Sequence, residues 1–413
     1  MLKNYLKIAI AVLLRRKFLT FVNLFGTVIV LTVLIVAFAI FESIVHPAGA
    51  QHRYDRILAV QTVTLGRPGQ RFDSGGVGPA FFTNYIKPLR TPDLVSLVSG
   101  LRTIVAYVDG RKLKMSLRLT DAAYWQILDF DVRAGRVLAP EDIDSGRSVV
   151  IVNEATAEAW FPGKAAVGRS IVIGTRSYEV VGVVRNEPET SRLAYADMWI
   201  PVTAAAVPSD SQQWTAPNQA LLYAANASKR EAMRQEYNAR VRRFEINPDP
   251  VRYDSMTAIA TTPLEDLAIR MLANDFEQRN YVAEFIAAAI VVTLLFMVLP
   301  AVNMINLNVG RILERAPEIG LRKASGAPTS ALVGQFIFEN LVLALVGGFI
   351  ALALAPFVLS LVNDVFRYGQ MRLDLPVLAA GLVLVAVFGV LSGAWPAWKM
   401  ARLDPATALK GQR

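Results

Sequence analysis

Few residues of this chain are of the types that carry out acid–base or metal chemistry. Glu141 and Asp142 are adjacent carboxylates, and such a pair could serve as a catalytic dyad, although we favour a turn or a helix start at this point. His46 and His52 are the only histidines, the chain has no cysteine, and neither HExxH nor GxSxG occurs. We therefore predict no catalytic residue and no metal site.

A nucleotide-binding loop is also missing from the sequence. The glycines between Gly66 and Gly78 do not match GxxxxGK[ST], and the segment Phe161-Pro162-Gly163-Lys164 lacks both the first glycine and the following hydroxyl. Such a loop cradles phosphates with its backbone N–H groups and its lysine. We therefore expect no cofactor in this chain and no ATP hydrolysis by the chain itself.

Among the polar residues in otherwise apolar stretches we single out four. A functional role is the first hypothesis there, because an ionised group in hydrocarbon costs several kcal/mol. They are Asn303, Asn306, Gln335 and Glu339. We favour a structural role, with Gln335, Glu339 and the next residue, Asn340, hydrogen bonding across a helix bundle.

Composition places this chain among membrane proteins. Of the 413 residues, 54% are hydrophobic and only 19% are charged, whereas soluble proteins have about 25% charged residues. The net charge of +9 could indicate nucleic acid, but the basic residues fall mainly beside apolar segments. We predict contact with membrane lipid and no nucleic-acid partner.

Four uncharged runs are long enough to cross a hydrocarbon core of about 30 Å as helices. The first could instead be a signal peptide cleaved near Ala48-Gly49-Ala50, but its apolar stretch exceeds the roughly 7–15 residues of such peptides. We predict spans at 18–42, 282–310, 331–363 and 375–398.

The distribution of lysine and arginine predicts the orientation of these spans. Basic residues gather in 1–17, 311–330 and 399–413, whereas in 364–374 Arg367 and Arg372 are balanced by Asp364 and Asp374. Because basic loops stay inside, we predict cytoplasmic termini, a cytoplasmic loop at 311–330, and an extracytoplasmic position for 43–281 and for 364–374. We expect residues 1–17 to form a cytoplasmic amphipathic helix at the membrane interface.

The segment 43–281 has the pattern of a folded mixed α/β domain. Leu113, Met115, Leu117 and Leu119 alternate with Lys112, Lys114, Ser116 and Arg118, as in a half-buried strand. Further strands are expected at 148–152, 170–174, 178–184, 220–225 and 251–256. Helices are expected at 154–161, capped by Asn153, and at 231–244, with Met233, Tyr237 and Val241 as its packing stripe.

The charged segment 263–284 is expected to be a helical stalk that extends the second span outward, since charged residues cannot lie in lipid. The predicted fold class is thus an α+β integral membrane protein. It has four transmembrane helices and a large mixed α/β extracytoplasmic domain between the first and the second.

The loop from Glu314 to Ala327, ERAPEIGLRKASGA, is similar to the "ER..EIG..KA.GA" signature of the FtsX-like permease family. Residues 335–339, the pair Gly347-Gly348 and residues 396–409 continue this match. Between the first two spans, Gly135-Arg136, Asp142, 149–153 and 178–184 resemble a MacB-like periplasmic domain. Pro317 departs from the signature, where the family commonly has a charged residue, and this leaves only the start of the loop helix in doubt.

The resemblance implies the permease subunit of an ABC transporter in the bacterial inner membrane, most simply an exporter in which outer domains move when ATP binds to a separate ATPase chain. A lipoprotein-releasing permease and an FtsX-like signalling scaffold are the alternatives. It further implies a subdomain at about 121–205 inserted into a β-α-β module. The implied ATPase-coupling residues are Glu314, Arg315, Glu318, Gly320, Arg322, Lys323 and Gly326.

The resemblance also implies partners. An ABC-type ATPase would bind ATP and Mg²⁺, and a second copy or a similar permease would complete the membrane part. A periplasmic adaptor and an outer-membrane channel are further candidates.

Overall fold

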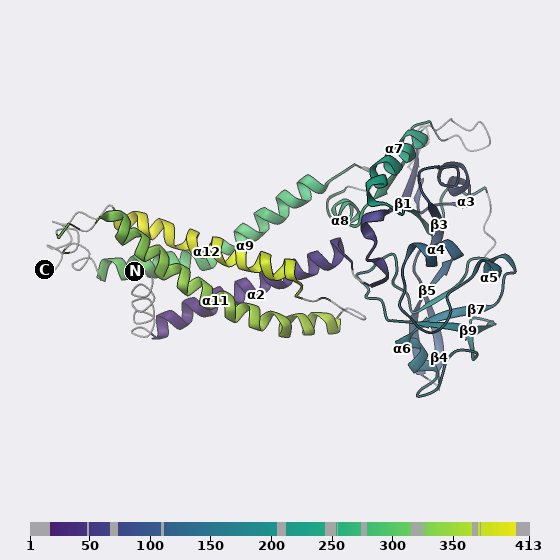
Figure 1. The fold of residues 1–413 in the computed structure, drawn as a ribbon, viewed down its shortest axis with the longest axis horizontal. Coiled ribbons are helices and arrows are strands. Elements are labelled where there is room, and N and C mark those ends of the chain that lie inside the picture. Colours follow the sequence, from purple (N-terminus) through teal and green to yellow (C-terminus); the bar gives the residue numbers. More distant parts are fainter. Residues whose placement is uncertain are drawn as a thin grey trace. The chain divides into compact units, whose positions relative to one another are not determined.

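The computed structural model describes residues 17–401 apart from 48, 67–72, 109–110, 205–211, 244–252, 254, 274–278, 315–320, 322–324, 327, 366–370 and 372. The chain divides into two compact units. The helical unit comprises Met1–Glu42, Ile286–Val365 and Met371–Arg413, and the mixed unit comprises Ser43–Phe285 and Phe366–Gln370. Figure 1 draws both, and each is described by itself below.

The long helices of the chain coincide with the apolar runs of the sequence. They are α2 (Lys17–Val45), α9 (Val282–Glu314), α11 (Thr329–Val365) and α12 (Leu375–Ala401). Among the described residues, Leu24–Val45 and Val333–Val365 are long and apolar enough to cross a membrane, while Val282–Val298 and Leu375–Val390 are shorter apolar stretches. Two of the four predicted spans thus meet this criterion.

Glycines bring three of these helices close together in the helical unit. A Cβ atom added at Gly348 of α11 would lie only 2.6 Å from Cγ2 of Val385 on α12, and one at Gly389 of α12 would lie 2.9 Å from Cβ of Ala344. Gly347 of α11 likewise faces Thr27 of α2, where an added Cβ would lie 3.3 Å from Thr27 Cγ2. Because glycine has no Cβ, the backbones can approach one another here.

The mixed unit contains two sheets. The first, called the host sheet, is antiparallel with the order β12-β1-β11-β3, and a short strand β2 also pairs with β1. Its strands are β1 (Ile57–Gly66), β2 (Asp73–Gly75), β3 (Leu94–Ser99), β11 (Asn218–Tyr223) and β12 (Ser255–Thr261).

The second, called the inserted sheet, has the order β4-β5-β10-β7-β9-β6, with β8 paired to β9. The pairs β5–β10 and β7–β9 are parallel. Since β4 and β5 belong to this sheet, the insertion begins near residue 102 and not at 121 as expected. Its strands are β4 (Arg102–Val108), β5 (Arg111–Thr120), β6 (Val132–Gly135), β7 (Val149–Asn153), β8 (Ser170–Ile173), β9 (Arg176–Val184) and β10 (Met198–Pro201).

Short helices connect and cover these strands (Figure 1). The Asn153 side chain accepts a hydrogen bond from the Thr156 N–H and so caps α6, which confirms the predicted cap. The predicted packing stripe of α7 is also buried. The helices are α3 (Pro79–Phe81), α4 (Ala122–Ile127), α5 (Pro140–Asp144), α6 (Glu154–Trp160), α7 (Arg230–Val241) and α8 (Pro263–Leu272), and a π-helical turn covers Phe82–Ile86.

Strand β1 is buried on both faces, and this fixes the layers of the mixed unit. Leu58 and Val60 share a core with Tyr237 of α7, while Ile57 and Ala59 point to the opposite face. That opposite face belongs to a core shared with Trp199 of the inserted sheet. The other face of the inserted sheet packs a third core that includes Val150, Val152, Met198 and Ile200.

Two expectations about the mixed unit are wrong. Lys112 and Lys114 are exposed as predicted, but Ser116 and Arg118 on the same face of β5 are only 8% and 2% exposed. The reason is that the chain at 192–197 covers this end of the strand, where Arg118 donates to the Arg192 carbonyl and the Asp197 carboxylate accepts from the Ser116 N–H. The predicted stalk is not one helix either, because α8 ends at Leu272, Ala273 is extended, and α9 begins only at Val282.

We expect residues 43–281, produced without the long helices, to be soluble and folded, because both sheets have their cores within this range. The measurement is a sharp denaturant transition by circular dichroism in buffer without detergent. A product that needs detergent at every reasonable choice of boundary would contradict the assignment of this unit as a separate folding domain.

Candidate functional site

The segment between α9 and α11 carries the residues predicted to couple to an ATPase. Glu314 is the last residue of α9. Gly326 has φ of +88°, in the left-handed region that residues with a Cβ rarely adopt. A Cβ added there would meet no atom within 4 Å, so the backbone conformation and not lack of space requires glycine. The other predicted coupling residues lie outside the described residues: Arg315, Glu318, Gly320, Arg322 and Lys323.

The polar residues of α11 lie one helical turn apart. Gln335 Nε2 donates a hydrogen bond of 3.1 Å to Glu339 Oε1, and both residues belong to α11. Asn340 is buried, and its side chain lies against Gly393 of α12, where an added Cβ would be 3.1 Å from its Cβ. The structure thus places a polar group at the contact of α11 with α12. Hydrogen bonding across the bundle stays a prediction.

Asn303 and Asn306 are in the helical part of α9. Their side chains lie outside what the structure describes, so their predicted role in the bundle is likewise untested.

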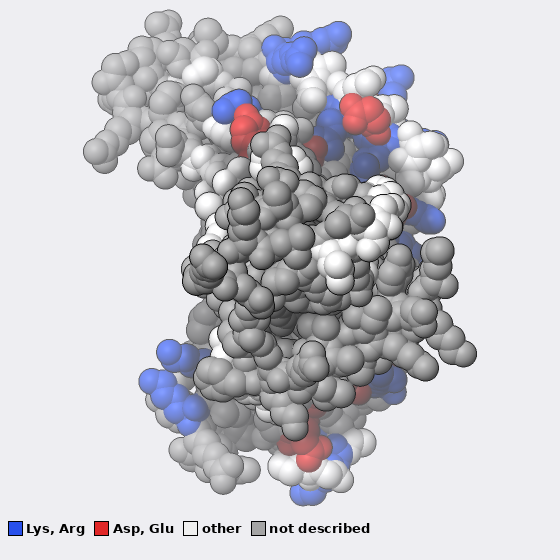
Figure 2. All heavy atoms as spheres, turned by 90° about the vertical axis from the view of Figure 1, so that its left-hand side faces the viewer, with Lys and Arg blue, Asp and Glu red and all other residues white. Residues whose placement is uncertain are grey.

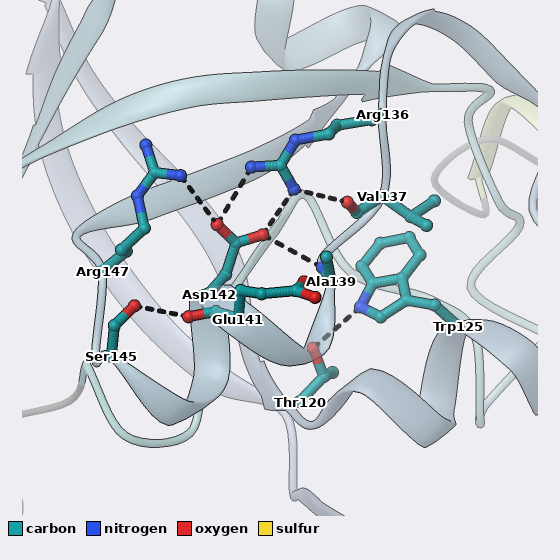
Figure 3. Close-up of polar contacts among 9 residues, drawn as sticks. All are labelled: Thr120, Trp125, Arg136, Val137, Ala139, Glu141, Asp142, Ser145 and Arg147. Atoms are coloured by element: carbon teal, nitrogen blue, oxygen red, sulfur yellow. Dashed lines mark hydrogen bonds and ion pairs between the residues drawn. The ribbon is translucent and has the colours of Figure 1, made fainter.

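Of the two adjacent acids of the mixed unit, Asp142 has a structural role, while Glu141 is exposed. Asp142 is only 1% exposed and accepts two hydrogen bonds from Arg136, one from the Ala139 N–H and one from Arg147 (Figure 3). The hydrogen bonds from Arg136 are the largest cause that lowers the pKa of Asp142. A carboxylate that is held ionised is a poor general acid. Both acids lie in the first turn of α5, which confirms the predicted helix start.

Glu187 was not singled out by any sequence pattern. Its side chain is buried, Oε1 accepts a hydrogen bond of 3.1 Å from the Ala50 N–H, and Oε2 has no hydrogen-bond partner. Burial raises the pKa of this carboxyl group to about 7. Gly49 beside it has φ of +67°, and an added Cβ would lie 2.6 Å from Glu187 Oε2. The carboxyl group therefore packs directly on the chain that follows α2.

A cavity of about 270 Å³ was also missed by sequence reasoning. It lies within the mixed unit, between the end of α2 with the residues that follow it, strand β1, the β9–β10 connection and α8. Arg192 and Arg270 line it, and they also line a neighbouring, more polar chamber of about 440 Å³ that includes Arg118. The alternation of β5 predicts a solvent face for Arg118, and the charges around Arg270 predict a stalk, so neither pattern indicates a cavity.

Within the described residues there is no group of three or more histidine, cysteine, aspartate and glutamate side chains arranged to hold a metal ion. Basic residues of the described part also form no single stripe on the face drawn in Figure 2, where they lie in separate groups, some beside acidic residues. The net positive charge is thus not gathered into one patch on the described part of this face.

Two family models match this chain. The MacB-like periplasmic core domain matches residues 20–240, more than half of the chain, and the FtsX-like permease C-terminal model matches residues 290–405.

Among curated proteins, a macrolide export ATP-binding/permease protein MacB of Syntrophobacter fumaroxidans is 24% identical over 354 residues, which is 75% of this chain and 49% of that protein. An ABC transporter permease, YknZ of Bacillus subtilis, is 22% identical and 76% of each chain is covered. The chain thus spans about half the length of the MacB relative.

Solved structures with some similarity include the periplasmic region of MacB from Actinobacillus actinomycetemcomitans. It is 12% identical with a TM-score of 0.35, and covers 52% of this chain and 94% of that chain. The extracellular domain of YknZ from Gram-positive bacteria is 16% identical with a TM-score of 0.33, and covers 48% of this chain and 100% of that chain.

The order of the two matched regions follows the two units, since the periplasmic model covers most of the mixed unit and the permease model covers α11 and α12. This chain therefore belongs to the FtsX-like permease family and carries a MacB-like periplasmic core domain.

Proposed function

We propose that this chain is the permease of an ABC-type exporter in a bacterial inner membrane, with four spanning helices, cytoplasmic termini and the mixed unit in the periplasm. The observation that carries the proposal is the family match, which joins a periplasmic core domain to a permease region. The names of the MacB relatives, which state macrolide export, support the direction of transport.

The energy for transport comes from an ABC-type ATPase that binds ATP and Mg²⁺, since this sequence has no phosphate-binding loop. A second copy of this chain or a similar permease completes the membrane part, and a periplasmic adaptor with an outer-membrane channel receives the exported compound. The segment 311–330 joins α9 to α11 and would pass motion of the ATPase into both helices.

Replacing Gly326 with valine is expected to weaken coupling, because a β-branched residue at φ of +88° costs about 1–3 kcal/mol and shifts the start of α11. Reversing Glu318 with arginine is expected to weaken docking of the ATPase. The measurement is binding of the ATPase encoded nearest to this chain, and its ATP hydrolysis, with the permease in nanodiscs. Wild-type permease should bind the ATPase and raise its rate, and each variant should lower both by tenfold or more.

The matched control is Asp374→Ala, an exposed residue just before α12 that the proposal places on the opposite side of the membrane. It should leave ATPase binding and hydrolysis at the wild-type level. Normal coupling by Gly326→Val and Glu318→Arg together with a defect in Asp374→Ala would reverse the proposed orientation. ATP hydrolysis by the purified chain alone would contradict its role as the non-hydrolysing subunit.

A further inference from the structure

The small cavity of the mixed unit has mainly apolar walls. They include Ile44, Pro47, Ile57, Leu193, Pro263 and Leu267. Its volume of about 270 Å³ is several times the roughly 30 Å³ that a water molecule occupies in the liquid. Ile44 is also next to the last residue of the candidate span Leu24–Val45. The wall of this apolar cavity thus includes the end of a candidate span, where that helix would leave the hydrocarbon.

The neighbouring polar chamber shares four lining residues with this cavity. They are Gln61, Glu189, Arg192 and Arg270. The two spaces therefore adjoin along these residues, which include two arginines, and one space is mainly apolar while the other is more polar. This division matches a ligand that has an apolar body and a charged end.

Positive charge exceeds negative charge in the polar chamber. Three arginines line it, namely Arg118, Arg192 and Arg270, while Glu189 is its only acidic lining residue among those described. Arg270 is already held by Asp266, through hydrogen bonds of 2.8 and 2.9 Å. Glu189 opposes one of the two remaining arginines, so one positive charge of the chamber is left to be balanced.

Arg118 is the more unusual of these two. Its side chain is buried, and its guanidinium group donates only to backbone carbonyls, those of Ser99, Arg192 and Tyr195 at 2.9, 2.8 and 3.4 Å. Its Nε atom is buried and has no hydrogen-bond partner, and the groups whose charges act on Arg118 are Tyr124 and Arg192, with no carboxylate among them. Buried charges in proteins are normally paired with an opposite charge, so this cation lacks the anion that would compensate its burial.

Part of the Arg192 side chain is exposed. Burial of the rest, followed by repulsion from Arg270, lowers its pKa, and the negative charge of Asp266 opposes this shift only in part. An anion bound between Arg192 and Arg118 would reverse the second effect and would offset part of the first.

We propose that the two spaces form one binding site for an anionic amphiphile, with the apolar body in the small cavity and a carboxylate-type acid group at Arg192 and Arg118. This inference deepens the proposed function and rests on it, because an exporter must first hold the compound that it moves. Binding is measured without an ATPase, so a failure of coupling and a failure of this site give different results.

The experiment titrates dodecanoate into the full chain in a non-ionic amphipol, which carries no carboxylate that could compete for the site, and measures the heat of binding. Dodecyltrimethylammonium tests the sign of the charge, and acetate tests the need for the apolar body. Dodecanoate is expected to bind at one site, with no saturable binding of the other two. Arg192→Gln should weaken dodecanoate binding about tenfold or more, because hydrogen bonds to charged groups are strong.

Leu267→Trp should also weaken binding, by filling the apolar cavity. Arg169→Gln is the matched control, since Arg169 is an exposed arginine that does not line either space, and it should bind as the wild type does. Unchanged affinity in Arg192→Gln would overturn the proposal, as would equal binding of the cationic amphiphile or equal loss in Arg169→Gln. Should Leu267→Trp fail to fold, the Arg192→Gln result and the comparison of the three probes still decide.

Discussion

Trp199→Ala is expected to lower the free energy of unfolding of the mixed unit by about 3–5 kcal/mol. Trp199 of β10 is fully buried in the core shared by the two sheets. Its ring packs edge to face on Phe130 and Trp125, with centroids 5.4 and 5.8 Å away. Alanine would remove these aromatic contacts and leave a cavity between the sheets, which the neighbouring rings can fill only in part.

The measurement is urea unfolding of residues 43–281, followed by far-UV circular dichroism so that loss of the indole fluorescence does not matter. Val172→Ala on β8 is the control, because that side chain is 56% exposed and its truncation should change stability by less than about 0.5 kcal/mol. A loss below about 1 kcal/mol for Trp199→Ala would show that this core is not packed as described.

Glu187→Gln is expected to remove the contribution of one buried carboxyl group to the pH dependence of the free energy of unfolding of the mixed unit. Burial raises the pKa of Glu187 from 4.5 to about 7 when the unit folds. Between these values the folded state binds the proton and the unfolded state does not, so the free energy of unfolding falls as pH rises. The fall begins near pH 4.5 and is complete above pH 7, and 2.5 pKa units correspond to about 3 kcal/mol.

Burial is the largest influence on the pKa of Glu187 and decides the sign of the shift, although the hydrogen bond from the Ala50 N–H and the charge of Arg185 lower this pKa. The measurement is urea unfolding of residues 43–281 from pH 4.5 to 8. Glutamine cannot ionise and should give a flatter profile than the wild type. Glu189→Gln is the matched control, because Glu189 is exposed and its loss should leave the profile unchanged. Parallel profiles for wild type and Glu187→Gln would refute the buried carboxyl group.

Local patterns predicted much of the secondary structure. Helix geometry and hydrophobic periodicity depend on near neighbours in the chain. They are sufficient to predict the cap by Asn153, the long apolar helices, and the buried stripe of Met233, Tyr237 and Val241. The failure at Arg118 has the opposite cause. Its burial depends on residues 192–197, far away in the sequence, and alternation within one strand cannot report that.

Among the candidate sites, too, a local motif is visible in the sequence, whereas a site formed by distant segments is not. The coupling role of segment 311–330 is a prediction that rests on a motif, and Gly326 within it has the left-handed conformation that only glycine adopts easily. The cavity was not found, because its walls come from three stretches of the mixed unit that no local pattern connects, near residues 44–61, 189–193 and 261–270. Glu187 was missed for the same reason, since its partner is the N–H of Ala50.

The position of the insertion has a consequence for how the mixed unit unfolds. Strands β3 and β11 pair along their whole length, from Leu94 with Tyr223 to Ser99 with Asn218, although the entire inserted sheet lies between them in the chain. While the insert is folded, its two ends are held near each other, and closing β3 on β11 costs little chain entropy. Once the insert unfolds, the same pair must close a long flexible loop, and that cost grows with the logarithm of the loop length. Loss of either sheet thus weakens the other, which makes the two sheets a single cooperative unit despite their separate strand orders.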